Sequence, residues 1–231
     1  MLSSAIAVSP STTVALDRYF DADWKIIPNG IDTDVFNPLA PAPRGFPRDV
    51  PTILFLGRFD PRNGLSTLIE SFQRVKGRSR RAKLIVVGDG PLRDHYYRLA
   101  GGDPDILFVG AVLEGRPSYY AHSTVYACPT TKASFGITLL ESMACETPVV
   151  CSDILGFRDV VVHEREALMV PCGDNRALAD SLVRILDDPG LGMQLGSTGR
   201  QNSLTYSWPR VTSQVLDVYR SVLGHVAEEV A

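Results

Sequence analysis

Residues 134–149, SFGITLLESMACETPV, place a glycine and a carboxylate on one short helix. We predict a helix over 135–145 that carries Glu141 on its second turn and ends before a strand at 148–151. A glycine at the first turn lets a ligand approach the backbone, and the free N–H groups of that turn favour an anion. Glu141 could then accept hydrogen bonds from sugar or ribose hydroxyls. The alternative is an ordinary helix with a solvated glutamate.

The segment resembles the Glu-x7-Glu motif of the retaining, nucleotide-sugar-dependent glycosyltransferases of the GT-B type. These are the group 1 glycosyl transferases, which include glycogen-synthase-like and phosphatidylinositol-mannosyltransferase-like enzymes. In that family the first glutamate contacts the transferred sugar and the second holds the ribose of the nucleotide. Glu141 matches the second position, and Ala133 stands at the first. The resemblance implies a catalytic and donor-binding role for Glu141 and the loss of one carboxylate contact to the sugar.

Further segments match the family in the order in which the family has them. They are IIPNGIDTDVFNP at 26–38, LGRFDPRNGL at 56–65, IVVGDGPL at 85–92 and YSWPRV at 206–211. The first resembles the last strand of the family's N-terminal domain and its exit into a linker. The resemblance thus covers the whole layout of the chain and implies the C-terminal, donor-binding half of a GT-B fold.

The resemblance also implies a site for a diphosphate. When a nucleotide sugar reacts, negative charge grows on the departing diphosphate and must meet cations or N–H dipoles. Arg58 matches the family's diphosphate-binding arginine, and its planar guanidinium suits bidentate phosphate contact. Asn63 replaces the family's next cation, a lysine, and we predict that it caps the following helix rather than contacts substrate. Arg62 or Lys132 could restore the lost charge.

Loops that follow the predicted strands complete the implied donor site. Beyond Arg58, Asn63 and Glu141, its residues are Gly88, Gly90 and Val109 in loops that hold the base, and Phe135, Gly136, Ile137 and Thr138, whose N–H groups would face the phosphates. For the Phe135 ring, simple packing and stacking near the sugar are equal alternatives. We expect Arg58 and these N–H groups to line one cleft, with Glu141 at its rim.

Short apolar runs alternate with amphipathic segments from Pro51 onward. Strands are predicted at 52–56, 84–87, 106–109, 124–128, 148–151 and 167–170, with helices between them and after the last. Strands that are nearly all apolar indicate a parallel sheet of about six strands covered on both faces, a doubly wound, Rossmann-like α/β fold. Ligands bind such sheets at the carboxyl ends of the strands, where the glycine-rich breaks of this chain lie.

The start of the chain does not fit that sheet. A predicted strand–helix–strand over residues 5–27 is too little to bury its own faces, and the segment after it is rich in proline. We therefore expect residues 1–37 to contribute nothing to the core. The predicted parts are 1–37 as the tail of an N-terminal acceptor domain, 38–50 as a linker, 51–205 as the nucleotide-sugar-binding domain and 206–231 as a C-terminal helix.

Composition excludes several classes of protein. A formal net charge of −3 gives no electrostatic footprint for nucleic acid. The four cysteines lack CxxC or His-paired spacing, which favours buried free thiols in a reducing cytoplasm over disulfides or a metal site. The sequence contains neither a long apolar run nor the pattern of a signal peptide. We expect a cytoplasmic protein, with peripheral contact to a membrane left open.

These observations predict the donor-binding half of a retaining hexosyltransferase that uses a UDP- or GDP-sugar, with neither a metal nor a cofactor. The acceptor, whether glycan, lipid or small molecule, is not defined. In the family the acceptor site and the acid–base groups come largely from the N-terminal domain. We therefore expect this chain alone to bind the donor without transferring its sugar, and we expect a missing N-terminal domain or a second chain as its partner.

Two alternatives come from other classes. A non-catalytic nucleotide-sugar-binding or regulatory module is favoured by Ala133 and Asn63, which replace two donor-site residues of the family. An NAD(P)-dependent oxidoreductase is disfavoured, because the Gly88-Asp89-Gly90 turn is not the GxGxxG fingerprint of dinucleotide-binding folds.

Glu146 is expected to be strained. The family usually has glycine where this helix ends, because the residue there often needs a positive φ. A glutamate at that position should cost about 1 kcal/mol.

Overall fold

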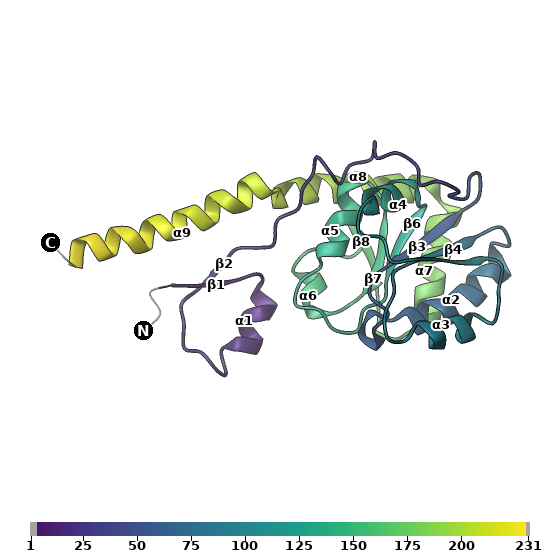
Figure 1. Ribbon diagram of the computed structural model, residues 1–231, viewed down its shortest axis with the longest axis horizontal. Coiled ribbons are helices and arrows are strands. Elements are labelled where there is room, and N and C mark those ends of the chain that lie inside the picture. The colour runs from purple at the N-terminus through teal and green to yellow at the C-terminus, as the bar shows by residue number, and fades with distance from the viewer. Residues whose placement is uncertain (1–3, 230–231) are drawn as a thin grey trace.

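A six-stranded parallel sheet forms the centre of the molecule (Figure 1). The computed structural model describes residues 4–229, with side chains up to residue 223. Neighbouring strands are all parallel and lie in the order β5-β4-β3-β6-β7-β8. They are β3 (Thr52–Leu56), β4 (Lys83–Val87), β5 (Ile106–Gly110), β6 (Val125–Cys128), β7 (Val149–Ser152) and β8 (Ala167–Val170). The predicted doubly wound α/β fold is confirmed.

Helices cover both faces of this sheet, because right-handed crossovers that run in opposite directions place their helices on opposite faces. One face packs against α2 (Leu65–Arg78), α3 (Arg93–Ala100) and α7 (Asn175–Asp187). The other packs against α4 (Arg116–His122), α5 (Ile137–Ala144) and α6 (Leu155–Arg158). Within β3 the division is visible residue by residue. Ile53 and Phe55 are buried on the α2 face, and Leu54 is buried on the α5 face.

The helix α8 (Pro189–Ser203) packs along α5 and was not predicted. Its four glycines lower the intrinsic helix propensity, which weakens the helical signal in the sequence. Tertiary contact explains two of them. A Cβ on Gly196 would lie 2.2 Å from the Glu146 carbonyl oxygen, and one on Gly199 would lie 2.9 Å from the Met143 side chain. The glycines therefore permit the close approach of α8 to α5.

Glu146 itself has a φ of 60°, so the predicted left-handed residue at the end of α5 is confirmed. The strained residue lets the chain turn sharply into β7. Its N–H donates to the Met143 carbonyl at 2.9 Å, and the Thr147 N–H donates to the Ser142 carbonyl at 3.1 Å. These bonds pair carbonyl groups that the last turn of α5 leaves free.

The first strands form a separate two-stranded parallel sheet of β1 (Ala5–Ala7) and β2 (Trp24–Ile26), joined by α1 (Pro10–Leu16). We call residues 5–26 the N-terminal unit, and residues 51–203, with the six-stranded sheet, the sheet domain. Figure 1 shows the N-terminal unit in purple beside the sheet domain and below the last helix. As predicted, its strands have no larger sheet to join.

The expectation that residues 1–37 contribute nothing to the core is wrong. Ile31 and Phe36 are 3% and 8% exposed and join the apolar cluster between the sheet and α5. The Ile31 N–H also donates to the Tyr206 carbonyl at 2.9 Å. These side chains follow β2 in an Asn- and Asp-rich segment whose periodicity predicts neither helix nor strand, so sequence pattern does not reveal their burial.

The chain ends with a short 3₁₀ turn, η2 (Leu204–Tyr206), and a long helix, α9 (Trp208–Glu229). Figure 1 shows α9 in yellow, projecting away from the sheet domain. The Trp208 ring covers Gly30, where a Cβ would lie 2.5 Å from it. Across residues 4–229, we find no helix with the length and apolarity that a membrane crossing requires.

Candidate functional site

The strand order places a crevice between β3 and β6. From β3 the chain continues to β4 and β5 on one side, and β6 to β8 lie on the other. The connections that follow β3 and β6 therefore lead to opposite sides of the strand order, and such a switch point is where doubly wound folds bind ligands. Arg58 follows β3, and the loop from Pro129 to Gly136 follows β6 and leads into α5.

Glycines fix the loop that carries Arg58. A Cβ on Gly88 would lie 1.9 Å from the Gly57 carbonyl oxygen, and one on Gly90 would lie 2.8 Å from that of Phe59. The loops after β3 and β4 are also hydrogen bonded to each other, since the Phe59 N–H donates to the Asp89 carbonyl at 2.9 Å. Gly88 and Gly90 are thus required for packing the β3 and β4 loops together. Their predicted contact with a base stays a prediction.

Asn63 does not cap α2, contrary to prediction. The N-cap is Gly64, in the left-handed conformation with φ 72°, and it has no side-chain cap. The Asn63 amide instead donates to the Arg58 carbonyl at 2.7 Å, which holds the β3 loop closed. A Cβ on Gly64 would lie 2.0 Å from the Pro129 carbonyl oxygen, so the loops after β3 and β6 touch at this point.

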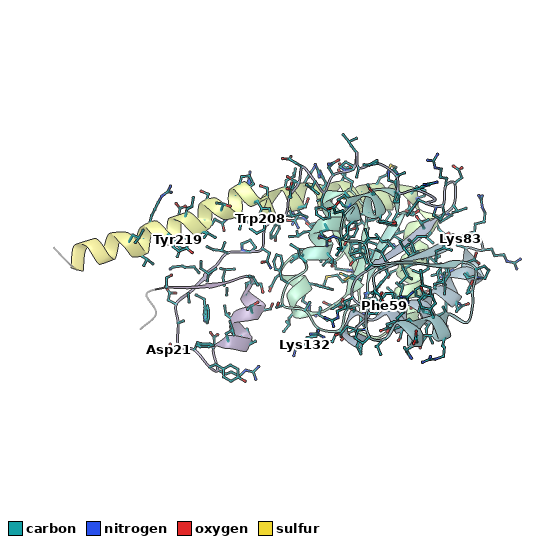
Figure 2. The ribbon with its side chains drawn as sticks, viewed as in Figure 1. Asp21, Phe59, Lys83, Lys132, Trp208 and Tyr219 are labelled. Carbon is teal, nitrogen blue, oxygen red and sulfur yellow. The ribbon has the colours of Figure 1, made fainter. Side chains whose placement is uncertain are left out.

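The two candidates for a replacement cation differ in their surroundings. Arg62 pairs with Asp60 at 3.1 Å, and the hydrogen bonds from Arg62 hold the pKa of Asp60 below its usual value. Lys132 is exposed, and among the described side chains no carboxylate pairs with it. It lies at the edge of the sheet domain that faces the N-terminal unit (Figure 2). The neighbouring Thr131 N–H donates to the Arg62 carbonyl at 2.7 Å.

The start of α5 presents unpaired backbone donors. The helix begins at Ile137, after Gly136 as N-cap, so it starts later than the predicted Phe135. Within the part of the chain that the structure describes, the N–H groups of 135–138 have no acceptor. The Phe135 ring packs against the core and lies 6.1 Å from the Tyr206 ring, which supports the packing alternative for it. Val109 lies on β5, separated from β3 by β4, and is 41% exposed.

Glu141 is buried, and its predicted place at the rim of the donor cleft stays a prediction. It is 4% exposed and lies between α5 and α4. The Arg116 guanidinium contacts its Oε1 at 2.9 Å, and the Tyr120 hydroxyl donates to its Oε2 at 2.9 Å. Burial raises the pKa of Glu141, and the Arg116 cation opposes that rise. Sequence reasoning missed Arg116 and Tyr120, because no spacing relates α4 to α5.

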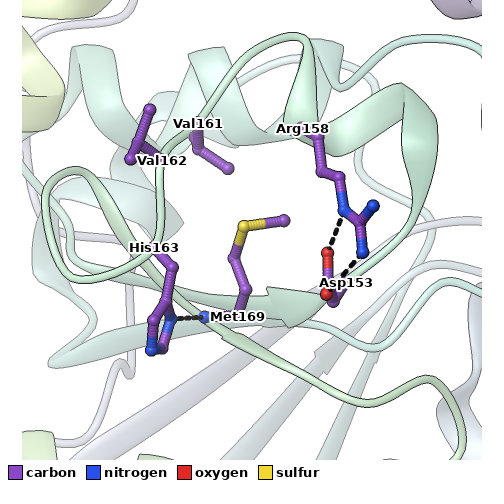
Figure 3. A pocket seen from close by; sticks show the side chains of 6 residues that line it. All are labelled: Asp153, Arg158, Val161, Val162, His163 and Met169. Atoms are coloured by element: carbon purple, nitrogen blue, oxygen red, sulfur yellow. Dashed lines mark hydrogen bonds and ion pairs between the residues drawn. The ribbon is translucent and has the colours of Figure 1, made fainter.

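A separate cavity of about 420 Å³ lies beside the ends of β7 and β8 (Figure 3). None of the predicted site residues lines it; its lining is Asp153, Arg158, Val161, Val162, His163 and Met169. Arg158 pairs with Asp153, and its hydrogen bonds lower the pKa of that carboxyl. The Met169 N–H donates to His163 Nδ1 at 2.9 Å. Among the side chains that the structure describes, residues 4–223, no three His, Cys, Asp or Glu groups gather as a metal site.

A family model described as "Glycosyl transferases group 1" matches residues 50–188, which are the strands, loops and helices that carry this crevice. The chain belongs to the group 1 glycosyl transferases. The resemblance drawn from the Glu141 segment and the other motifs is confirmed.

Several known proteins are similar over most of this chain. Phosphatidyl-myo-inositol mannosyltransferase of Mycobacterium leprae (strain TN) is 37% identical, across 85% of this chain and 53% of that protein. Sucrose-phosphate synthase from Thermosynechococcus elongatus has a TM-score of 0.85 at 31% identity, across 95% of this chain and 58% of that one. Anabaena HepE, solved with UDP-glucose, shares the fold with a TM-score of 0.84 at 20% identity, across 96% and 64%. The chain spans about half the length of the curated relatives it matches.

Two departures from the motifs of the group 1 glycosyl transferases now have a structural setting. Asn63 closes the loop of Arg58, as described above. At Ala133 the backbone is packed tightly, since a Cβ on Gly156 would lie 2.2 Å from the Ala133 carbonyl oxygen. The loop before α5 therefore keeps a defined course, although this position lacks the family's carboxylate.

Proposed function

We propose that this chain is the donor-binding half of a retaining glycosyltransferase that takes a hexosyl group from a nucleoside diphosphate sugar. One observation carries the proposal. Arg58 and the unpaired N–H groups at the start of α5 flank the same switch point in a chain of the group 1 family. A guanidinium and a helix N-terminus both suit a diphosphate.

The proposed chemistry follows from where charge develops. As the bond between the anomeric carbon and the diphosphate oxygen breaks, the electron pair stays on the diphosphate. Arg58 would stabilise that charge, and so would the dipoles of the free N–H groups at 135–138. Lys132, which unlike Arg62 has no carboxylate partner among the described side chains, would replace the charge that Asn63 does not bring. The proposal involves no cofactor.

The rest of the enzyme is proposed to lie in a second domain. Because the chain spans about half of its curated relatives, we propose that an N-terminal domain, in the same protein or another chain, supplies the acceptor site. Residues 1–37 would be the tail of that domain and 38–50 the linker. UDP- and GDP-sugars are both candidate donors, as expected from the sequence. One similar protein is named a phosphatidyl-myo-inositol mannosyltransferase, and another was solved with UDP-glucose. We propose a cytoplasmic location, with peripheral contact to a membrane left open.

Calorimetry with UDP and GDP tests the donor site. Arg58→Ala should weaken binding of the nucleotide by about 1.5–3 kcal/mol, the contribution of a charge-assisted hydrogen bond. Arg62→Ala is the matched control and should have little effect, because Asp60 already pairs with Arg62. Unchanged affinity in Arg58→Ala would remove Arg58 from the site.

A non-catalytic module on the same scaffold is the second candidate, favoured by Ala133 and Asn63. It would bind nucleotide in the same titration. Assay of the chain together with its N-terminal half separates the two proposals, since only an enzyme would then release UDP or GDP from the sugar nucleotide.

A further inference from the structure

Two residues of α4 hold the Glu141 carboxylate from two sides. Arg116 contacts one oxygen and Tyr120 donates to the other, each at 2.9 Å. Tyr120 is fully buried, whereas the Arg116 side chain is 38% exposed and that of Glu141 only 5%. A group that reaches Glu141 from solvent must therefore approach it beside Arg116.

Arg116 is itself held in place by contacts outside α4. It is the first residue of the helix, after Gly115 with φ 80°, and its guanidinium lies 5.5 Å from the centre of the Phe36 ring. The Phe36 carbonyl accepts a hydrogen bond from Arg200 of α8 at 3.1 Å. A cation over an aromatic ring is attracted to it, which limits the orientations that Arg116 can take. The carboxylate of Glu141 is thus presented in one orientation.

We propose that Arg116 is a positioning residue for ribose recognition, which keeps Glu141 ionised and oriented to accept hydrogen bonds from the nucleotide's ribose hydroxyls. This rests on the proposed donor site. A carboxylate has about four lone-pair positions on its two oxygens. Arg116 and Tyr120 use one on each oxygen, so one on each is left for the two neighbouring hydroxyls of a ribose.

The charge state of Glu141 depends on few groups. Arg116 and Tyr120 face it from α4, Tyr126 from β6, and Cys145 from its own helix. Burial raises the pKa of both tyrosines and raises that of Cys145 to about 12, so these groups stay neutral in acid. Arg116 is therefore the cation that favours the ionised carboxylate. Removing it should raise the pKa of Glu141, which burial already raises.

The test compares UDP and GDP with their 2′-deoxy forms by calorimetry. The wild-type chain should prefer the ribonucleotide by about tenfold or more, the value of a hydrogen bond to a charged group. In Arg116→Met the preference should fall to about threefold or less, and Arg116→Lys should restore part of it. Arg184→Met, which breaks the exposed ion pair between Arg184 of α7 and Glu164, is the matched control and should keep the preference.

A pH series provides the second measurement. Ribose preference needs the ionised carboxylate, so it is present above the pKa of Glu141 and is lost as the pH falls through it. In Arg116→Met that loss should occur at higher pH than in the wild type, an effect that a merely structural role would not produce.

The outcomes separate this inference from the donor site itself. If Arg116→Met weakens ribo- and deoxynucleotides equally, or leaves the preference and its pH midpoint unchanged, the inference is overturned and the donor site stands. If the wild type binds UDP and GDP without ribose preference, the inference is likewise overturned. If the wild type binds neither nucleotide, the proposed donor site fails, and the inference that rests on it fails too.

Discussion

The sheet domain and the N-terminal unit use the same parallel strand pairing but are held in different ways. In the sheet domain β3 has helices over both faces, and Ile53 is fully buried. In the N-terminal unit β2 pairs only with β1, and Ile26 is 42% exposed. Parallel strands are stable when both faces are covered. The comparison shows that strand pairing forms in both regions, whereas burial is concentrated in one.

Hydrogen bonds rather than a shared core attach α1 to the sheet domain. The Ser9 hydroxyl donates to the Ser134 carbonyl at 2.9 Å, and the Ser11 N–H donates to Asp159 Oδ2 at 3.0 Å. Ser134 lies in the loop before α5, next to the crevice, and Asp159 directly follows α6. The N-terminal unit is therefore positioned against the proposed donor site without contributing to the stability of the sheet.

Matched isoleucine substitutions compare burial in the sheet domain with burial in the N-terminal unit. Ile53→Ala should lower the free energy of unfolding by about 2–5 kcal/mol, because it leaves a cavity in a packed core. Ile26→Ala, the same change at an exposed position, should cost less than about 1 kcal/mol. Urea unfolding followed by circular dichroism measures both. Equal losses would mean that the two sheets form one cooperative core.

A truncation series tests where the boundary between the two regions lies. Removal of residues 1–26 should change the free energy of unfolding by less than about 1 kcal/mol, since the part removed buries little. Removal of 1–37 should cost about 2–4 kcal/mol, because Ile31 and Phe36 belong to the core of the sheet domain. Thermal melting distinguishes the two truncated forms. If both truncations leave the melting temperature unchanged, the contribution of Ile31 and Phe36 is refuted.

The smallest effect is local. Ser9 caps α1, accepting from the Thr12 N–H, and also contacts Ser134. Ser9→Ala should therefore weaken α1 and its attachment by about 1 kcal/mol. Faster amide hydrogen exchange in α1, with exchange in β3 unchanged, is the expected result. Thr13→Ala, whose hydroxyl bonds only within its own helix at Pro10, is the control. Equally faster exchange in β3 would contradict the separation of the two regions.

Local pattern accounts for most of what could be predicted. Apolar runs such as Thr52–Leu56 place the strands, because a strand covered on both faces must be apolar throughout. Glycines in sequence predict the tight turn at Gly88–Gly90, because glycine tolerates backbone conformations that other residues avoid. The position of Glu146 at a helix end predicts its left-handed conformation. Arg58 lies beside the switch point because it directly follows β3, and the strand order fixes where the loop after β3 begins.

Such local patterns do not predict how the helices pack against one another. Arg116 and Glu141 lie on different helices, and their ion pair depends on how α4 and α5 cross the sheet. For the same reason, the glycine-containing sequence of α8 does not predict a helix, and the glycines are explained only by the packing of α8 against α5.

By itself, then, the sequence determined the strands, the order of the loops and the membership in the glycosyl transferase family, since these depend on residues near one another in the chain. The tertiary structure decided that Glu141 is buried beside Arg116, that Asn63 closes the Arg58 loop and that Ile31 and Phe36 belong to the core. These contacts join side chains from separate elements, and only close packing selects which of them meet.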